Sequence, residues 1–196
     1  MIELMPGAGT VAQHEFNDQT QARMARMLGK DYRGQDCSMA SALEAIGERW
    51  TLLIIRDAFY GVRRFNDFQA HLDIPKAVLS DRLNGLVEDG IFARVPDPEH
   101  TGRHVYELTP SGRELWPVIH ALLMWGGKHR RPNSRVYRHA RCGTLLTQSG
   151  ECPHCEVAPA PQDIVTERRR GYRPMRDDPV TVALRAPRRL LEPLET

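Results

Sequence analysis

Four residues in the C-terminal third of the chain have the types and spacing of metal ligands. His139 and Cys142 are separated by two residues, and Cys152 and Cys155 form a second pair with the same separation. A Cys-x2-Cys pair lets two thiolates reach one ion from a tight turn, and zinc prefers four nitrogen or sulfur ligands in a tetrahedron. The pattern therefore predicts a closed, structural Zn2+ site in a zinc-ribbon-like segment.

The fourth ligand and the metal itself both have alternatives. His154 lies inside the second cysteine pair and competes with His139, although a residue between two ligands of such a turn usually points outward. Without a metal, the segment would be a degenerate ribbon or a redox-active Cys-x2-Cys pair. The segment has few large apolar residues, so metal binding would supply stability that a hydrophobic core cannot. A complete set of four ligands leaves no open position for catalysis.

Cys37 stands apart from this cluster and directly precedes a predicted helix. A helix N-terminus lowers the pKa of a thiol and favours the reactive thiolate, while Arg33 and Asp36 nearby act in opposite directions. Cys37 is therefore a candidate redox sensor. The alternative is a small, inert, buried residue, which is the usual role of a lone cysteine.

Residues 47–112 hold the elements that would position a nucleic-acid interface. They contain short helical patterns, then two strand patterns around a polar turn, then the start of another helix. That order is a helix-turn-helix followed by a β-wing, which places one helix in the major groove of DNA. The predicted fold class is mainly α with a small β-wing, a winged helix-turn-helix, followed by the zinc-ribbon-like segment.

Hydrophobic periodicity and turn residues give the expected element boundaries. Helices are expected over residues 14–28, 38–46, 50–59, 64–72 and 75–89, and strands over residues 91–95 and 105–108. A long helix should follow Thr109, and Pro117 should kink it or mark its true start. The apolar stripe of that helix continues beyond what a small domain needs, so we expect it to pack against a second subunit.

The helix over residues 75–89 has the profile of a DNA recognition helix. Leu79, Leu83, Leu86 and Val87 recur at helical spacing and form its predicted buried face. The opposite face carries small and polar side chains, which can approach base edges where bulky apolar groups could not. The candidate DNA contacts on this helix and around it are Arg63, Arg64, Lys76, Ser80, Arg82, Asn84, Arg103 and His104.

These candidates have different expected roles. Asn84 can pair bidentately with adenine, and Arg82 could clamp a phosphate or brace the helix. Arg103 and His104 are expected at the wing tip, where arginine favours the negative potential of a narrow minor groove. Any single arginine could be an ordinary solvated charge. The set is more informative, because its members lie on the elements that a winged helix presents to DNA.

The composition is that of a globular protein and argues against several classes. The 196 residues are 41% hydrophobic and 27% charged, and the net charge of +2 means that DNA contact would need a local basic surface. No apolar run reaches the ~20 residues of a membrane span, and no secretory signal is visible, so a cytoplasmic location with reduced cysteines is expected. No nucleophile–base pair or phosphate-binding glycine motif occurs, so no enzymatic activity is expected.

Shifts in composition divide the chain into four expected parts. These are an N-terminal arm (1–35), a winged helix-turn-helix with its dimerisation helix (36–129), the zinc-ribbon-like segment (130–160), and an Arg- and Pro-rich C-terminal extension (161–196). The last part shows no clear hydrophobic period, so the sequence predicts no element within it.

The motifs IGERWTLLIIRD, RRFNDF, LSDRL, LVEDGI and YELTPSG, together with Cys37, resemble the HxlR family of bacterial winged-helix regulators. The resemblance covers about residues 36–127, and the motifs are specific in order and distance. It implies a homodimeric transcription factor related to the MarR group that binds a pseudo-palindromic operator. Several members sense oxidants or electrophiles through a cysteine at the position of Cys37. Two departures are Cys37-Ser38-Met39, where the family commonly has Cys-Pro-Val, and the long C-terminal extension.

A second hypothesis from another class is a protein-interaction module, in which the winged domain and the ribbon contact a protein partner. The small, polar outward face of the helix over residues 75–89 favours DNA. A small aromatic effector could bind between the dimerisation helices and the winged domain, as in MarR-type regulators. Trp50, Phe59, Trp116 and Trp125 could line that cleft, although aromatic residues at helical spacing are more often core.

Overall fold

The computed structural model describes residues 32 and 34–196, and the boundary between its two units falls between Glu44 and Ala45. The helix expected over residues 14–28 lies outside the described residues. Helix α2 spans Ser38–Ile46, as predicted, and begins directly after Cys37. Among the residues described, no helix is long and apolar enough to cross a membrane.

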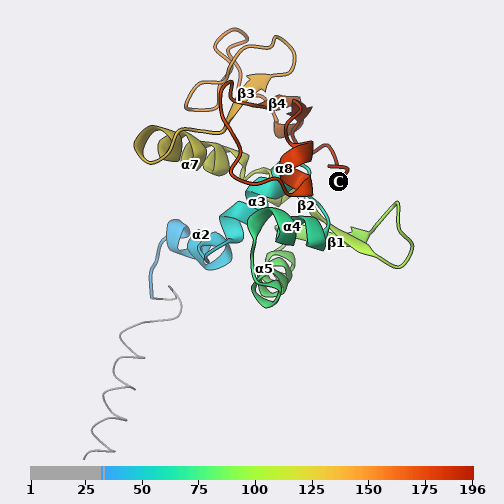
Figure 1. Cartoon of the computed structure of the whole chain (residues 1–196). Helices are drawn as coiled ribbons and strands as arrows, with labels where there is room; N and C mark the ends of the chain where they lie inside the picture. The colour runs from blue at the N-terminus through green and yellow to red at the C-terminus, as the bar shows by residue number, and fades with distance from the viewer. Residues whose placement is uncertain (1–31, 33) are drawn as a thin grey trace, which may run out of the picture. The chain divides into compact units, whose positions relative to one another are not determined.

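Three short helices of the second unit form the helix-turn-helix (Figure 1). They are α3 (Thr51–Phe59), α4 (Phe65–Leu72) and α5 (Lys76–Glu88), and each begins one residue later than predicted. Trp50 precedes α3 because its backbone is left-handed, with φ of 82°. The left-handed Asp73, with φ of 56°, ends α4 and opens the turn that leads into α5.

Side chains from all three helices meet in one core. Ile54 and Phe59 of α3, Phe68 of α4, and Leu79 and Leu83 of α5 have no exposed surface. Burying a side chain of this size contributes roughly 1.5–3 kcal/mol, so these contacts dominate the stability of the unit. The predicted apolar face of α5 is confirmed.

Asp57 is a fully buried carboxylate that ties α3 to α4. Its Oδ1 accepts a hydrogen bond from Arg56 at 2.6 Å, and its Oδ2 lies 2.7 Å from Nδ1 of His71. Burial acts to raise the pKa of Asp57, but the charge of Arg56 and the contact with His71 outweigh it and lower the pKa. Asp57 is therefore a buried anion whose partners lie on two neighbouring helices.

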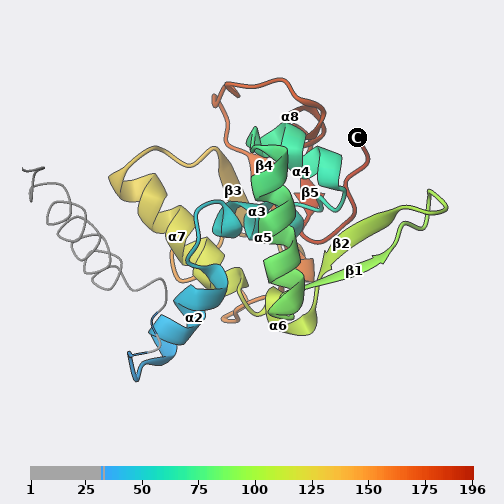
Figure 2. The same ribbon diagram turned by 90° about the horizontal axis from the view of Figure 1, so that it is seen from below.

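The wing is a two-stranded antiparallel ribbon that projects beside the helices (Figure 2). Strand β1 (Phe92–Pro96) pairs with β2 (His104–Leu108), with Phe92 opposite Leu108 and Pro96 opposite His104. Phe92, Val105 and Leu108 are buried, so one face of the ribbon joins the core. The two strands lie within one residue of their predicted positions.

The helix expected after Thr109 is broken into two. Thr109 caps α6 (Pro110–Arg113) by accepting a hydrogen bond from the backbone N–H of Gly112, and α7 then runs from Trp116 to His129. Pro117 lies in the first turn of α7, where its missing N–H costs nothing. Of the two roles considered for Pro117, the structure shows that it marks a true helix start.

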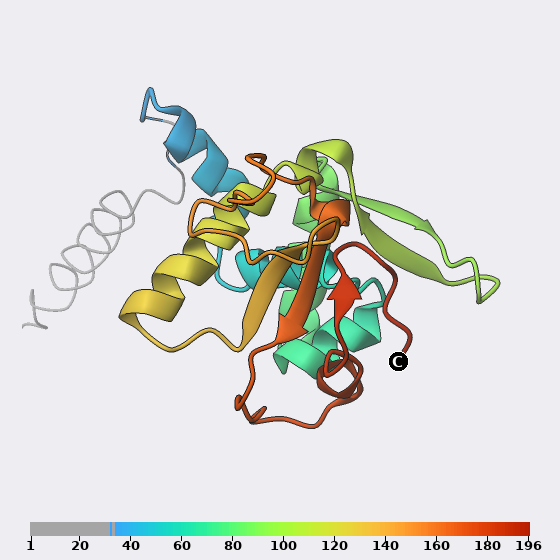
Figure 3. The same cartoon turned by 90° about the horizontal axis from the view of Figure 1, so that it is seen from above.

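The C-terminal part forms a second small sheet. Strands β3 (Arg135–His139), β4 (Ile164–Arg168) and β5 (Arg188–Arg189) are antiparallel in that order, with η1 (Pro161–Asp163) and α8 (Pro179–Ala183) in the connections. In the view from above, this sheet lies in front of α3 (Figure 3). In the view from below, α5 lies in front of α3 (Figure 2). The sheet and α5 therefore lie on opposite sides of α3.

The second sheet shares its core with the winged helix. The hydroxyls of Tyr60 and Tyr137 are 2.6 Å apart, and Tyr137 also packs against Trp116 with ring centroids 5.3 Å apart. The backbone N–H of Leu194 donates to the carbonyl of Gly61 at 2.9 Å. Gly61 has φ of 92°, and a Cβ there would overlap the carbonyl of Glu192, so this close approach requires glycine.

Candidate nucleic-acid interface and metal centre

The outward face of α5 is exposed and free of large apolar groups. Lys76, Ala77, Ser80, Asp81 and Asn84 are all exposed on this helix. Three of the predicted contacts, Lys76, Ser80 and Asn84, thus share an accessible surface. Ser80 and Asn84 can donate and accept hydrogen bonds, and Lys76 can donate them, as contact with base edges and phosphates requires.

Arg82 lies at the edge of that surface and is already engaged. Its Nη2 donates to Oε2 of Glu48 at 3.1 Å, and its Nη1 lies 3.1 Å from Oδ2 of Asp81. Of the two roles predicted for Arg82, this geometry corresponds to bracing the helix. The same ion pair offsets the negative charge of Asp81, which by itself would repel a phosphate.

Arg63 and Arg64 are directed toward carboxylates near the wing. Arg63 lies 3.0 Å from Oε1 of Glu107, and Arg64 contacts Oδ2 of Asp97 at 3.2 Å and also Glu99. The backbone N–H of Glu99 and the side chain of Arg64 hold the pKa of Asp97 at about 2, so its charge persists. In this arrangement the two arginines fix the wing against the start of α4, and any phosphate contact would compete with these pairs.

Arg103 and His104 lie on the exposed part of the wing, as predicted. Both are exposed, and His104 opens β2 opposite Pro96. Sequence reasoning passed over Arg94, which is also exposed on β1, opposite Tyr106. The alternation of side chains between the two faces of β1 could have identified Arg94 as exposed from the sequence. The wing therefore presents two exposed arginines, Arg94 and Arg103.

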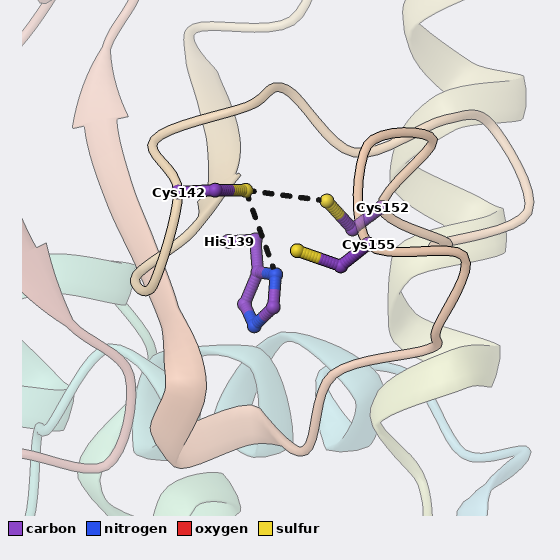
Figure 4. Close-up of side chains that lie close together, drawn as sticks. All are labelled: His139, Cys142, Cys152 and Cys155. Atoms are coloured by element: carbon purple, nitrogen blue, oxygen red, sulfur yellow. Dashed lines mark hydrogen bonds between the residues drawn. The ribbon is translucent and has the colours of Figure 1, made fainter.

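The four predicted metal ligands come together in space (Figure 4). One ligand atom from each of His139, Cys142, Cys152 and Cys155 can be chosen so that all lie within 4.8 Å of one another. Sγ of Cys142 is 3.4 Å from Sγ of Cys152 and 3.7 Å from Nδ1 of His139. These residues form a group that could hold one metal ion.

His139, and not His154, belongs to this group. His139 is buried at the end of β3, whereas His154 is exposed, although its Nδ1 lies 3.6 Å from Sγ of Cys155. A residue between the two cysteines of a tight turn points away from the site that they enclose. The donor set is therefore three sulfurs and one nitrogen, which suits zinc.

Backbone hydrogen bonds shape the two turns that carry the cysteines. The N–H of Gly143, which has φ of 72°, donates to the carbonyl of His139 at 2.8 Å and closes the first turn. In the second turn, the N–H of Cys152 donates to Val157 and the N–H of Glu156 donates to Cys152. Backbone hydrogen bonds thus fix the conformation of both turns.

The pKa values of two thiols in the group are shifted in opposite directions. Hydrogen bonds from Thr144 lower the pKa of Cys142 to about 6, whereas desolvation and the neighbouring thiols raise the pKa of Cys155 to about 11. A cluster of thiols cannot lose all its protons while the negative charges face only one another. A divalent cation would compensate those charges, because metal binding releases the thiol protons.

Cys37 is exposed, and its pKa is lowered by hydrogen bonds from the backbone N–H groups of Ala40 and Met39. These groups belong to the first turn of α2, so the local cause is the helix N-terminus that the sequence indicated. An exposed thiol with a lowered pKa is accessible to oxidants. Exposure argues against the alternative of an inert buried residue.

An apolar surface covers one side of α7. Val118, Leu122 and Trp125 are 44%, 48% and 54% exposed. Leu122, together with Leu52 and Leu53 of α3, borders a groove of about 550 Å3. By contrast, Phe59 and Trp116 pack edge to face in the core, with centroids 5.2 Å apart, so they do not line an effector cleft.

Comparisons with known proteins agree with this geometry. The model of the HxlR-like helix-turn-helix family matches residues 45–134. The uncharacterized HTH-type transcriptional regulator Rv3095 of Mycobacterium tuberculosis is 41% identical over 145 residues, which cover 72% of this chain and 92% of the relative. YdeP, a regulator of the same type from Bacillus subtilis, is 32% identical over 109 residues, covering 54% of this chain and 85% of YdeP.

Solved structures are also similar to part of the chain. The reduced form of the transcriptional regulator YodB from B. subtilis is 31% identical and covers 50% of this chain and 98% of YodB, with a TM-score of 0.42.

Proposed function

The chain belongs to the HxlR-like helix-turn-helix family and is an HTH-type transcriptional regulator, and we propose that it acts as a homodimer on a pseudo-palindromic operator. The observation that carries the proposal is the exposed polar face of α5, with Lys76, Ser80 and Asn84 free of large apolar neighbours. Its relatives are regulators, and we propose no catalytic role. In the operator complex, α5 lies in the major groove and the wing reaches the adjacent minor groove or backbone.

The apolar surface of α7 supports the dimer. An exposed stripe of Val118, Leu122 and Trp125 would be costly in water and is suited to burial against the same stripe of a second copy. A symmetric dimer presents two copies of α5, and this matches the two halves of a pseudo-palindrome.

DNA binding by α5 predicts distinct effects for two substitutions. Asn84→Ala should weaken binding to the operator by about 1–3 kcal/mol, because a bidentate base contact is lost, and should leave binding to random duplex unchanged. Arg103→Ala should weaken binding to the operator and to random duplex, and should make the affinity depend less steeply on salt concentration. Fluorescence anisotropy with the chain's own upstream region as probe measures both effects. Asn133→Ala, outside the α5 face, serves as the control.

Equal affinity of wild type for the upstream region and random DNA, unaltered by either substitution, would contradict the proposal. That outcome would favour the protein-interaction module instead.

The Cys/His group is proposed to hold one structural Zn2+ ion. His139, Cys142, Cys152 and Cys155 would fill its four positions, and this leaves none for a reacting water. Bound zinc would supply stability, since the turns it closes carry little apolar surface of their own.

Oxidation of Cys37 is proposed to control DNA binding. Hydrogen peroxide should lower the affinity of wild type for its operator, whereas Cys37→Ser should keep its affinity, because the exposed low-pKa thiol is the reacting group. Anisotropy measured before and after oxidation gives the result, with zinc release followed in parallel to exclude damage at the metal site. Equal sensitivity of both proteins would assign the response to other residues.

A further inference from the structure

A basic pocket of about 230 Å3 lies between the helix-turn-helix and the C-terminal elements. Residues from α3, α4, α7, β3, β4 and α8 or adjoining loops line it. No aspartate or glutamate is among the lining residues of the described chain. Five lining side chains are arginines, namely Arg56, Arg135, Arg168, Arg176 and Arg185.

Arg135 is the central feature of this pocket. It is only 8% exposed and donates to Oγ1 of Thr166 at 2.9 Å and to the carbonyl of Leu184 at 2.7 Å. Among residues 34–196, no carboxylate lies within 4.0 Å of its guanidinium. Burial lowers the pKa of Arg135, and the charges of Arg56 and Arg168 lower it further. A buried cation with cationic neighbours and no counter-ion is unfavourable unless an anion joins it.

The carboxylate partners of the other four arginines do not cancel the positive charge of the pocket. Arg56 is neutralised by Asp57 at 2.6 Å, and Arg176 is paired with Asp73 at 3.4 Å and with Asp178 at 3.6 Å. Arg168 and Arg185 are exposed, and no carboxylate of the described chain lies within 4.0 Å of either guanidinium. The pocket therefore has a net positive charge after its own ion pairs are counted.

Apolar surface accompanies the charge. The ring of Tyr60 lies 5.4 Å from Cζ of Arg135 and 5.8 Å from Cζ of Arg56, and Leu123 and Leu184 complete the wall. We propose that this pocket binds a small organic anion, a carboxylate or phosphate carried on a compact apolar body. Planar guanidinium groups bind both anions through paired hydrogen bonds. The volume lies below the range of about 300–1,000 Å3 that suits drug-sized ligands, so the anion is small.

The pocket is linked to the helix-turn-helix through Arg176. Its Nη2 donates to the carbonyl of Ala70 at 2.9 Å, and its Nη1 lies 3.4 Å from Asp73, the left-handed residue that ends α4. An anion that draws Arg176 into the pocket removes these contacts from the turn before α5. The regulatory consequence, altered operator affinity, rests on the proposed function, whereas anion binding itself does not.

Isothermal titration calorimetry of the full zinc-loaded chain tests the proposal. The probes are benzoate, its neutral isostere benzamide, and inorganic phosphate. Benzoate should bind saturably and benzamide should not. Arg168→Gln and Arg185→Gln should each lower the affinity for benzoate about tenfold or more, because a charge-assisted hydrogen bond is lost. Arg170→Gln removes an exposed charge two residues from Arg168 but outside the pocket lining and should bind like wild type.

Two outcomes would overturn the proposal. In the first, wild type shows no saturable heat with benzoate or phosphate; if Arg168→Gln and Arg185→Gln then weaken duplex DNA binding, the arginines serve DNA phosphates. In the second, benzamide binds as well as benzoate. Failure of operator binding in the earlier assay, with benzoate binding intact, would reject the proposed function and leave the pocket assignment standing.

Discussion

Replacing Cys152 with serine is expected to abolish zinc binding and to destabilise the second sheet. Cys152 is fully buried, and its Sγ lies 3.4 Å from Sγ of Cys142, so serine leaves an incomplete donor set. Apparent binding free energies of structural zinc reach about 10–16 kcal/mol in zinc-finger peptides, which sets an upper bound for the loss. We expect the free energy of unfolding to fall by several kcal/mol and not by the full amount, because Tyr137 and Ile164 still bury apolar surface in the common core.

The measurement combines zinc stoichiometry with thermal unfolding. Wild type should hold one zinc per chain, and Cys152→Ser should hold none and melt at a lower temperature. His154→Ala is the matched control, because this exposed histidine neighbours Cys155 but lies outside the four-ligand group. Loss of zinc in His154→Ala, or full zinc and unchanged melting in Cys152→Ser, would reject the assigned donor set.

Replacing Asp57 with alanine is expected to destabilise the helix-turn-helix by about 3–5 kcal/mol, as for other buried ion pairs that lose one partner. Arg56 and His71 would lose contacts of 2.6 and 2.7 Å to a carboxylate with no exposed surface. Urea unfolding at constant protein and zinc concentration measures the change. The control is Asp81→Ala, which breaks an adjacent-residue pair with Arg82 whose carboxylate is 72% exposed. It should cost at most about 1 kcal/mol.

The contribution of Asp57 should also depend on pH. Burial opposes ionisation, but Arg56 and His71 lower the pKa of Asp57 below its unfolded value. The unfolded carboxyl therefore binds protons at higher pH than the folded one, so stability is present above the unfolded pKa and is lost in acid as pH falls through the folded value. Equal urea midpoints for wild type and Asp57→Ala at neutral pH would contradict this role.

Local sequence patterns were sufficient to predict the winged helix. The helices and strands of residues 38–108 rest on periodicity, on left-handed turns such as Asp73 and on proline at helix starts, all of which are set by neighbours in sequence. The Cys/His group was also predictable, because the spacing of its cysteines is a local property. Only the fold could distinguish His139 from His154, since their burial depends on distant strands.

The C-terminal sheet could not be predicted in the same way. Strand β5 has two residues, and the backbone N–H of the buried Leu194 donates to Gly61 in the segment after α3, more than a hundred residues earlier in the chain. Such pairing leaves no periodic signal. The carboxylate partners of Arg63 and Arg64 were missed for the same reason, because Glu107 and Asp97 approach them only through the tertiary fold.

The most direct test of the central claim is a hydroxyl-radical footprint of the full chain on its own upstream region. A homodimer that inserts two copies of α5 should protect two half-sites on one face of the duplex, about 10–10.5 base pairs apart or a multiple of that spacing. Leu122→Glu, which charges the apolar surface of α7, should abolish the paired protection. A single protected patch unchanged by Leu122→Glu, or no protection at any concentration, would contradict a dimeric winged-helix regulator.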